Sequence, residues 1–173
     1  MLDLHPYGID YLEVKPIQAW GDADFKKLFD ALASEHVAPV INGTFDDDNI
    51  NKLLSISYCR QCGYCCEAMA NEEGDASVIV TQKELETIAH ELDTTVDELT
   101  SKLEKHPKEK DCWCIPLPCM FFKDNKCQIY DVRPYVCRTY PLTGVEHENM
   151  SYIAVSLGCD YGRDIYKRLL QDE

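Results

Sequence analysis

The chain has 173 residues, of which ten are cysteine, and its 31 acidic against 17 basic residues give a formal net charge of −14. This length suits one domain, and an acidic charge without a basic patch excludes nucleic acid and anionic membrane surfaces as partners. No stretch approaches the roughly 18 apolar residues of a membrane span, and the first residues lack the pattern of an export signal. We therefore expect a cytoplasmic protein without direct membrane insertion, whose acidity mildly favours a basic protein partner.

Residues 1–50 are predicted to form an N-terminal helical arm, followed by a metal-binding domain at 51–173. Proline and glycine interrupt residues 1–21, which predicts irregular structure there. Asp22 or Asp24 can cap a helix, and a short helix is expected near residue 50. The apolar face of the first helix is spaced for burial and consists of Phe25, Leu28, Phe29 and Leu32. We expect this face to recognise a partner protein; the alternative is that it covers the chain's own core.

Further along the chain, short strands alternate with capped helices. Val78–Val80 predicts a strand, and two Thr-x-x-Glu patterns, beginning at Thr81 and Thr95, predict capping boxes that open two helices. Ile129–Tyr130 suggests a step from strand to turn, residues 152–157 a strand, and Asp160 or Gly162 the start of a final helix. These elements predict a small, loop-rich, metal-centred α+β domain.

The first cysteine stretch places Cys59, Cys62, Cys65 and Cys66 within eight residues. A Cys-x2-Cys-x2-Cys run allows three thiolates to point at one centre from a curled loop, as in ferredoxin-type clusters. Gly63 permits the tight turn that this loop needs. Because adjacent side chains point apart, we expect Cys65 and Cys66 to serve two different sites.

Zinc is the alternative metal for these thiols. Zinc knuckles pair two short Cys-x2-4-Cys units, and here only the first stretch has that spacing, while no histidine stands at finger spacing. Ligation by sulfur alone without knuckle pairs favours iron–sulfur over zinc. A disulfide framework is disfavoured by the expected cytoplasmic location.

These cysteines and their neighbours resemble the YkgJ-type cysteine-cluster family, also called the CxxCxxCC family, of zinc- or iron-chelating proteins. The resemblance covers about residues 59–160 and is carried by Cys-x2-Cys-Gly-x-Cys-Cys, Pro-Cys-x-Phe, Cys-x-Ile-Tyr-x2-Arg-Pro-x2-Cys-Arg-x-Tyr-Pro and Gly-Cys. It implies a helical insert at 81–103 and eight metal-binding cysteines: Cys59, Cys62, Cys65, Cys66, Cys119, Cys127, Cys137 and Cys159. Cys112 and Cys114 depart from the family pattern, and the arm at 1–50 lies outside it.

The resemblance also bears on the metal and on the function. A relative of this family is fused into a flagellin lysine methylase that carries an iron–sulfur cluster, which favours iron and suggests methyl transfer nearby. We therefore expect one or two [4Fe–4S] clusters that bind distant segments together, in an accessory protein for redox or oxygen sensing or for electron handling, docked on a larger redox or methyl-transfer enzyme. Two alternatives stay open: a structural zinc-binding interaction module, and an enzyme that assists methyl transfer or the delivery of metal or clusters.

Two arginines flank the last cysteines of the second stretch. Arg133 and Arg138 lie beside Cys137 in the sequence and can supply positive charge to a thiolate cluster. The alternative is a rigid turn in which arginine stacks on Tyr130 or Tyr140.

Asp46–Asp48 lacks the pattern of a calcium loop and is read as a solvated helix N-terminus.

Overall fold

The structure is a computed structural model that describes residues 17–34, 38–67, 77–147 and 150–172. The chain divides into two compact units, which are described separately. Unit 1 is formed by Met1–Arg60 and Pro141–Glu173, and unit 2 by Gln61–Tyr140. The predicted division after residue 50 stays a prediction. Within the described part of the chain, no helix has the length and apolar character needed to cross a membrane.

Unit 1 contains an antiparallel sheet in the order β1-β8-β7. Its strands are β1 (Val40–Asn42), β7 (Leu142–His147) and β8 (Met150–Val155). The central strand β8 pairs Ile153 with both Ile41 and Gly144. Side chains alternate along a strand, and Ile153 and Val155 both point into the core, where they are buried.

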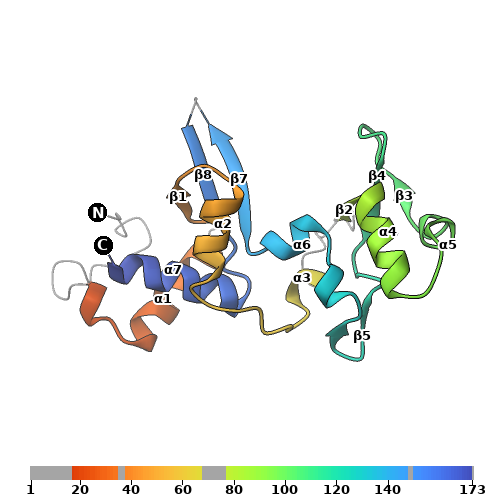
Figure 1. Ribbon diagram of the computed structural model, residues 1–173. Helices are drawn as coiled ribbons and strands as arrows, with labels where there is room; N and C mark the ends of the chain where they lie inside the picture. Colours follow the sequence, from red (N-terminus) through yellow and green to blue (C-terminus); the bar gives the residue numbers. More distant parts are fainter. Residues whose placement is uncertain (1–16, 35–37, 68–76, 148–149, 173) are drawn as a thin grey trace. The chain divides into compact units, whose positions relative to one another are not determined.

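The helices of unit 1 pack their apolar faces on this sheet and on one another (Figure 1). They are the 3₁₀ helix η3 (Ile17–Ala19) and the α-helices α1 (Asp22–Ser34), α2 (Asp47–Leu54) and α7 (Asp160–Asp172). Asp46 caps α2 by accepting a hydrogen bond from Asn49 N–H, as the reading of the Asp46–Asp48 run predicted.

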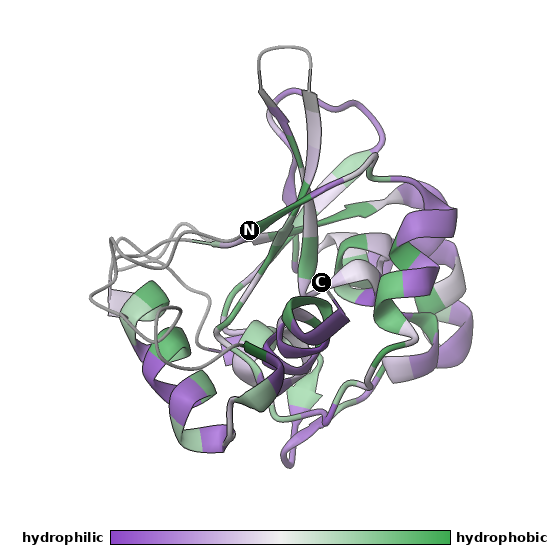
Figure 2. Ribbon diagram, turned by 90° about the vertical axis from the view of Figure 1, so that its left-hand side faces the viewer, coloured by the Kyte–Doolittle hydropathy of each residue, from purple (hydrophilic) through white to green (hydrophobic). Residues whose placement is uncertain are grey.

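The apolar face of α1 is packed inside unit 1. Phe25 and Leu28 are fully buried, in the same core as Ile165 and Tyr166 of α7. Figure 2 shows green and purple stretches on the same helices, as expected of helices with one buried face. In the structure this face therefore covers the chain's own core, the alternative named above. Recognition of a partner protein by the N-terminal arm stays a prediction.

Unit 2 holds a second antiparallel sheet, in the order β2-β4-β3, and a two-stranded hairpin. The strands are β2 (Ser77–Thr81), β3 (Glu104–Lys105), β4 (Cys112–Pro116), β5 (Phe122–Lys123) and β6 (Lys126–Cys127). The helices are α3 (Tyr64–Glu67), α4 (Gln82–Glu91), α5 (Val96–Thr100), η4 (Tyr130–Val132) and α6 (Tyr135–Thr139). Val80, Leu85, Ile88 and Ile115 form the centre of its core.

The short helices and small antiparallel sheets confirm the predicted α+β class. Both capping boxes are present, at Thr81 with Glu84 and at Thr95 with Glu98. The prediction of a strand at Ile129–Tyr130 is wrong, because β6 ends at Cys127 and Tyr130 begins the helix η4. Ile129 is instead a buried residue of the core between these two elements.

Candidate metal centre

The first cysteine motif crosses the boundary between the units, which falls between Arg60 and Gln61. Cys59 therefore belongs to unit 1 together with Cys159, and the remaining predicted ligands belong to unit 2. All eight cysteines of unit 2 are thiols and none is in a disulfide.

The loop before α3 curls tightly because two of its residues adopt left-handed backbone conformations. Gln61 has φ of 53° and Gly63 has φ of 81°. The carbonyl of Gly63 then accepts hydrogen bonds from the N–H groups of Cys66 (2.8 Å) and Glu67 (2.9 Å). This turn confirms the expected role of Gly63 and starts the single helical turn that carries Cys65 and Cys66.

The sulfur atoms of Cys65 and Cys66 lie 3.9 Å apart. The expectation that these adjacent side chains point apart is therefore wrong. It holds for an extended strand, whereas consecutive residues of a helical turn differ by only about 100° in direction. The two sulfur atoms are thus direct neighbours.

The second cysteine stretch is joined to the first through its backbone. Cys119 N–H donates to the carbonyl of Cys66 at 2.7 Å, and the carbonyl of Cys119 accepts from Phe122 N–H at 3.0 Å. Phe122 then pairs with Cys127 across the β5–β6 hairpin. These bonds bring Cys119 and Cys127 to the α3 loop, although more than fifty residues separate them from it in the sequence.

Cys137 lies on α6, which begins directly after Pro134. Cys137 N–H donates to the carbonyl of Pro134 at 2.9 Å. The neighbouring Arg133 stacks on the Tyr130 ring, with its guanidinium carbon 3.6 Å from the ring centroid, and its Nε donates to the Tyr130 carbonyl at 2.7 Å. The stacked turn is therefore present. The positive charge of Arg133 also acts to lower the pKa values of Cys65, Cys127 and Cys137, although burial and neighbouring thiols act in the opposite direction.

One thiol proton is shared among three sulfur atoms. A hydrogen bond from Cys66 lowers the pKa of Cys65 to about 7 and does the same for the pKa of Cys119. The same contacts, first with Cys119 and then with Cys65, raise the pKa of Cys66. Because a thiol has a single proton to donate, Cys66 can donate to only one of its two sulfur neighbours at a time.

In the two remaining thiols of this group, Cys127 and Cys137, burial disfavours the ionised form. Burial raises the pKa of Cys127, and burial together with the nearby Cys65 and Cys119 raises the pKa of Cys137 to about 12. The five thiols thus repel one another when ionised, with one arginine as compensation. A thiophilic cation would remove this repulsion, so the donor set fits a thiolate-bound metal.

The structure does not gather every predicted ligand equally. Cys62 is exposed. Cys112 and Cys114, which are not among the predicted ligands, lie on β4. Among the described residues, no three histidine, cysteine or carboxylate side chains converge closely enough to hold one ion in their present rotamers. The sulfur atoms are neighbours, and side-chain rotation has to bring them onto a common metal.

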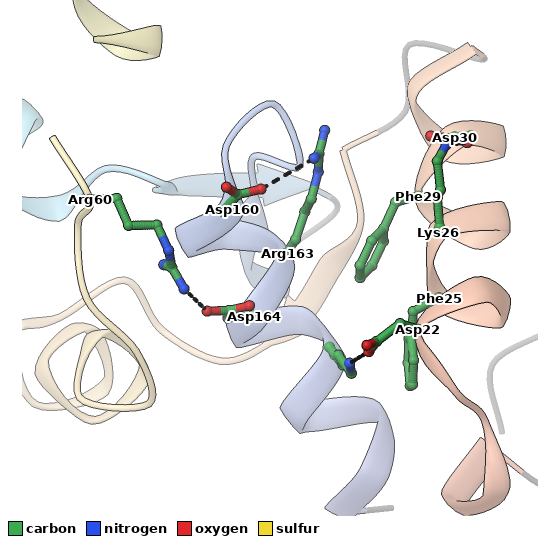
Figure 3. A pocket seen from close by; sticks show the side chains of 10 residues that line it. Asp22, Phe25, Lys26, Phe29, Asp30, Arg60, Asp160, Arg163 and Asp164 are labelled. Carbon is green, nitrogen blue, oxygen red and sulfur yellow. Dashed lines mark hydrogen bonds and ion pairs between the residues drawn. The ribbon is translucent and has the colours of Figure 1, made fainter. Parts of the chain in front are cut away.

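In unit 1, an ion pair attaches the loop of Cys59 to helix α7. Arg60 pairs with Asp164 (Figure 3). Ser57 Oγ donates to the same carboxylate at 2.7 Å. Buried Cys159 directly precedes α7, and its carbonyl accepts a hydrogen bond from Arg163 N–H in the first turn of that helix at 3.1 Å. Both predicted ligands of unit 1 are thereby fixed to the first turns of one helix. No motif in the sequence indicated this contact, since its partners are more than a hundred residues apart.

A pocket of about 370 Å³ opens beside the same helix turns, between α1 and α7. Each of its four cations is paired with a carboxylate, so the lining is neutral and does not indicate a charged ligand. The pairs are Lys26–Asp30, Arg60–Asp164, Arg163–Asp160 and Lys167–Asp22.

Glu84 links the predicted capping box to the helix of Cys137. Its carboxylate accepts from Thr81 N–H at 2.9 Å and from Tyr135 N–H, at the start of α6, at 2.6 Å. Burial opposes its ionisation, but the hydrogen bonds from Thr81 and Tyr135 outweigh burial and lower the pKa of Glu84. The capping pattern predicted the first bond; nothing in the sequence predicted the second.

We expect Glu84→Gln to lower the free energy of unfolding by about 1–2 kcal/mol at neutral pH, since it weakens hydrogen bonds to a charged acceptor. A carboxylate whose pKa is lowered by folding stabilises the fold at pH values above its pKa in the unfolded chain. This contribution is lost as the pH falls through the lowered pKa of the folded state. The difference between wild type and variant should therefore shrink as the pH falls below about 4.5, the ordinary value for this group.

Urea unfolding at a series of pH values measures this difference. Glu86→Gln, at an exposed position on the same helix, is the matched control and should change stability by less than about 0.5 kcal/mol. Equal effects of the two substitutions, or a difference that grows in acid, would contradict the role of Glu84.

Comparison with known proteins agrees with this arrangement of cysteines. The sequence model of the CxxCxxCC family, described as "Putative zinc- or iron-chelating domain", matches residues 58–160. A similar curated protein is the uncharacterized protein MJ0661 of Methanocaldococcus jannaschii, 35% identical over 97 residues, which are 51% of this chain and 47% of that protein. The chain thus spans about half the length of that relative. No solved structure matches. Because the family model covers more than half of the chain, from the first cysteine motif to the last, the chain belongs to the CxxCxxCC family of zinc- or iron-chelating domains.

Proposed function

We propose that this metal-binding domain holds an iron–sulfur cluster of the [4Fe–4S] type through the family cysteines. In this proposal the protein is a redox- or oxygen-responsive, or electron-handling, accessory of a larger enzyme in the cytoplasm. Bound there, the cluster would supply one-electron chemistry or sensitivity to oxygen. Thiolate ligation of this kind suits a reducing compartment.

The observation that carries the proposal is the sulfur-only group in unit 2. Five thiols, from α3, the turn before β5, β6 and α6, interact with one another, and among the residues that the structure describes no histidine or carboxylate takes part. Cys119 and Cys127 also pack against the apolar core of unit 2, which includes buried Phe121 and Ile129. Sulfur ligands in an apolar surrounding are typical of iron–sulfur sites.

One observation favours structural zinc as a second candidate. The Cys65–Cys66 sulfur separation of 3.9 Å is close to the about 3.8 Å that two thiolates adopt on one tetrahedral zinc with Zn–S bonds of about 2.3 Å. The protein would then be an interaction module without redox chemistry.

Anaerobic purification followed by analysis of iron, zinc and acid-labile sulfide, with a visible absorption spectrum, distinguishes the candidates. We expect a brown protein with iron and sulfide in similar amounts. Cys137→Ser should reduce both the metal content and the melting temperature, because the binding free energy of the metal is partly folding free energy. Cys112→Ser, outside the family pattern, is the control and should keep its metal.

Colourless wild-type protein with stoichiometric zinc would replace the first candidate by the second. Full metal content and unchanged melting of Cys137→Ser would remove Cys137 from the ligands.

A further inference from the structure

Cys112 and Cys114 lie on the same face of β4, the central strand of the unit 2 sheet. Side chains alternate along a strand, and Trp113 and Ile115 occupy the core side, where Ile115 is buried and Trp113 packs on the same core. The two cysteines therefore lie together on the opposite side of the sheet.

This face is partly open. On β2, the residue opposite Cys114 is Ile79, which is exposed, and the residue opposite Cys112 is Thr81. On β3, Glu104 lies opposite Cys114. Both cysteines are half-buried thiols. A small ion has access to them.

The pair is separate from the thiols of the candidate metal centre. Cys119 and Cys127 pack against the apolar core, on the side that Ile115 faces, whereas Cys112 and Cys114 are not part of that core. Among the described residues, neither thiol of the pair hydrogen-bonds any of the five thiols discussed above.

The spacing of the pair suits a bridging cation better than a disulfide. Residues i and i+2 of a strand are about 6.6 Å apart, near the upper limit of the Cα separation in disulfides. Sulfur atoms that lean toward each other over this distance can hold one ion between them.

The donors on this face select the kind of ion. Zinc requires four ligands, and the pair supplies two. His106 adjoins Cys112 through its backbone, but the Nδ1 atom of His106 accepts the N–H groups of Lys108 (3.3 Å) and Glu109 (2.9 Å) and stabilises its own turn. Two thiolates without a nitrogen ligand suit a soft monovalent ion, and Cu(I) is the biological one.

We propose that Cys112 and Cys114 form a second metal site, in which the two thiolates of one strand face bind a single Cu(I) ion independently of the family cysteines.

Anaerobic titration of the metal-loaded protein with Cu(I), against a chromogenic Cu(I) chelator, tests this site. Wild type should retain one more equivalent of Cu(I) than the double variant Cys112→Ser/Cys114→Ser. The variant should keep its iron or zinc, which makes the test independent of the identity of the family metal. Equal Cu(I) retention would overturn the proposal, and loss of iron or zinc from the variant would assign the pair to the family centre instead.

Copper X-ray absorption of wild type with one equivalent of Cu(I) tests the ligands without any substitution. Two sulfur neighbours and no nitrogen are expected at the copper. Three or more sulfur neighbours, or nitrogen ligation, would overturn the two-thiolate site even if the double variant failed to fold.

Discussion

Gly63→Ala is expected to destabilise unit 2 by about 2–5 kcal/mol and to reduce the metal content of the protein. A Cβ atom on Gly63 would lie 2.4 Å from Cζ of Phe122, and the backbone has φ of 81°. Left-handed backbone costs an L-residue about 1–2 kcal/mol, and overpacking adds about 1–3 kcal/mol. Urea unfolding and metal analysis of the same samples measure both effects.

Two further variants separate the causes. Gly21→Ala is the matched control, because its Cβ meets nothing closer than Asp24 Oδ2 at 3.9 Å, and it should cost much less. The double variant Gly63→Ala/Phe122→Leu should recover the part of the loss that comes from the ring and keep the part that comes from the backbone. If Gly63→Ala and Gly21→Ala are equally stable, the close packing of the α3 loop on Phe122 is refuted.

Gly162→Ala is expected to lower the free energy of unfolding by at least about 3 kcal/mol. Its Cβ would lie 1.9 Å from the carbonyl oxygen of Ser156, whose own N–H is held by the carbonyl of Pro141 at 2.8 Å. Alanine is better than glycine inside a helix by about 1 kcal/mol, which is too little to offset overlap with backbone. The first turn of α7, which follows Cys159, has to move.

Thermal unfolding followed by circular dichroism measures this loss, with Gly21→Ala again as the control. A melting temperature equal to or above that of wild type would mean that helix propensity outweighs the contact, and would refute the close approach of α7 to Ser156.

Local signals predicted the longer helices of this protein, but not the short helices α3, η4 and α6. The apolar spacing from Phe25 to Leu32 and the capping box at Thr81 specify structure within a few residues, and both are present. The strands β1 and β7 were not predicted, because their pairing with β8 depends on residues about a hundred positions away or on a partner strand. For the same reason the sequence predicted a strand at Ile129, whose apolar side chain serves the core outside any sheet.

The cysteine motif predicted which thiols matter but not how they meet. Spacing indicated the loop of Cys62 and Cys65, while the hydrogen bond from Cys119 to Cys66 joins segments that no local pattern connects. The contact of Cys65 with Cys66 depends on the single helical turn of α3, which is too short for periodicity to reveal. Long-range contacts such as Glu84 to Tyr135 require the three-dimensional structure.

Because unit 1 is built from two separate stretches of the chain, the two units cannot be completed at the same time during synthesis on the ribosome. Chains emerge from the N-terminus, so Gln61–Tyr140 is complete while residues 141–173 are still unmade. Until then β1 has no β8 to pair with, and the aromatic face of α1 lacks Ile165 and Tyr166 as its cover. The thiols of unit 2 thus reach the cell's metal supply before Cys159 does. Until residues 141–173 are synthesised, the apolar face of α1 is uncovered, and exposed apolar surface of this kind promotes aggregation and chaperone binding.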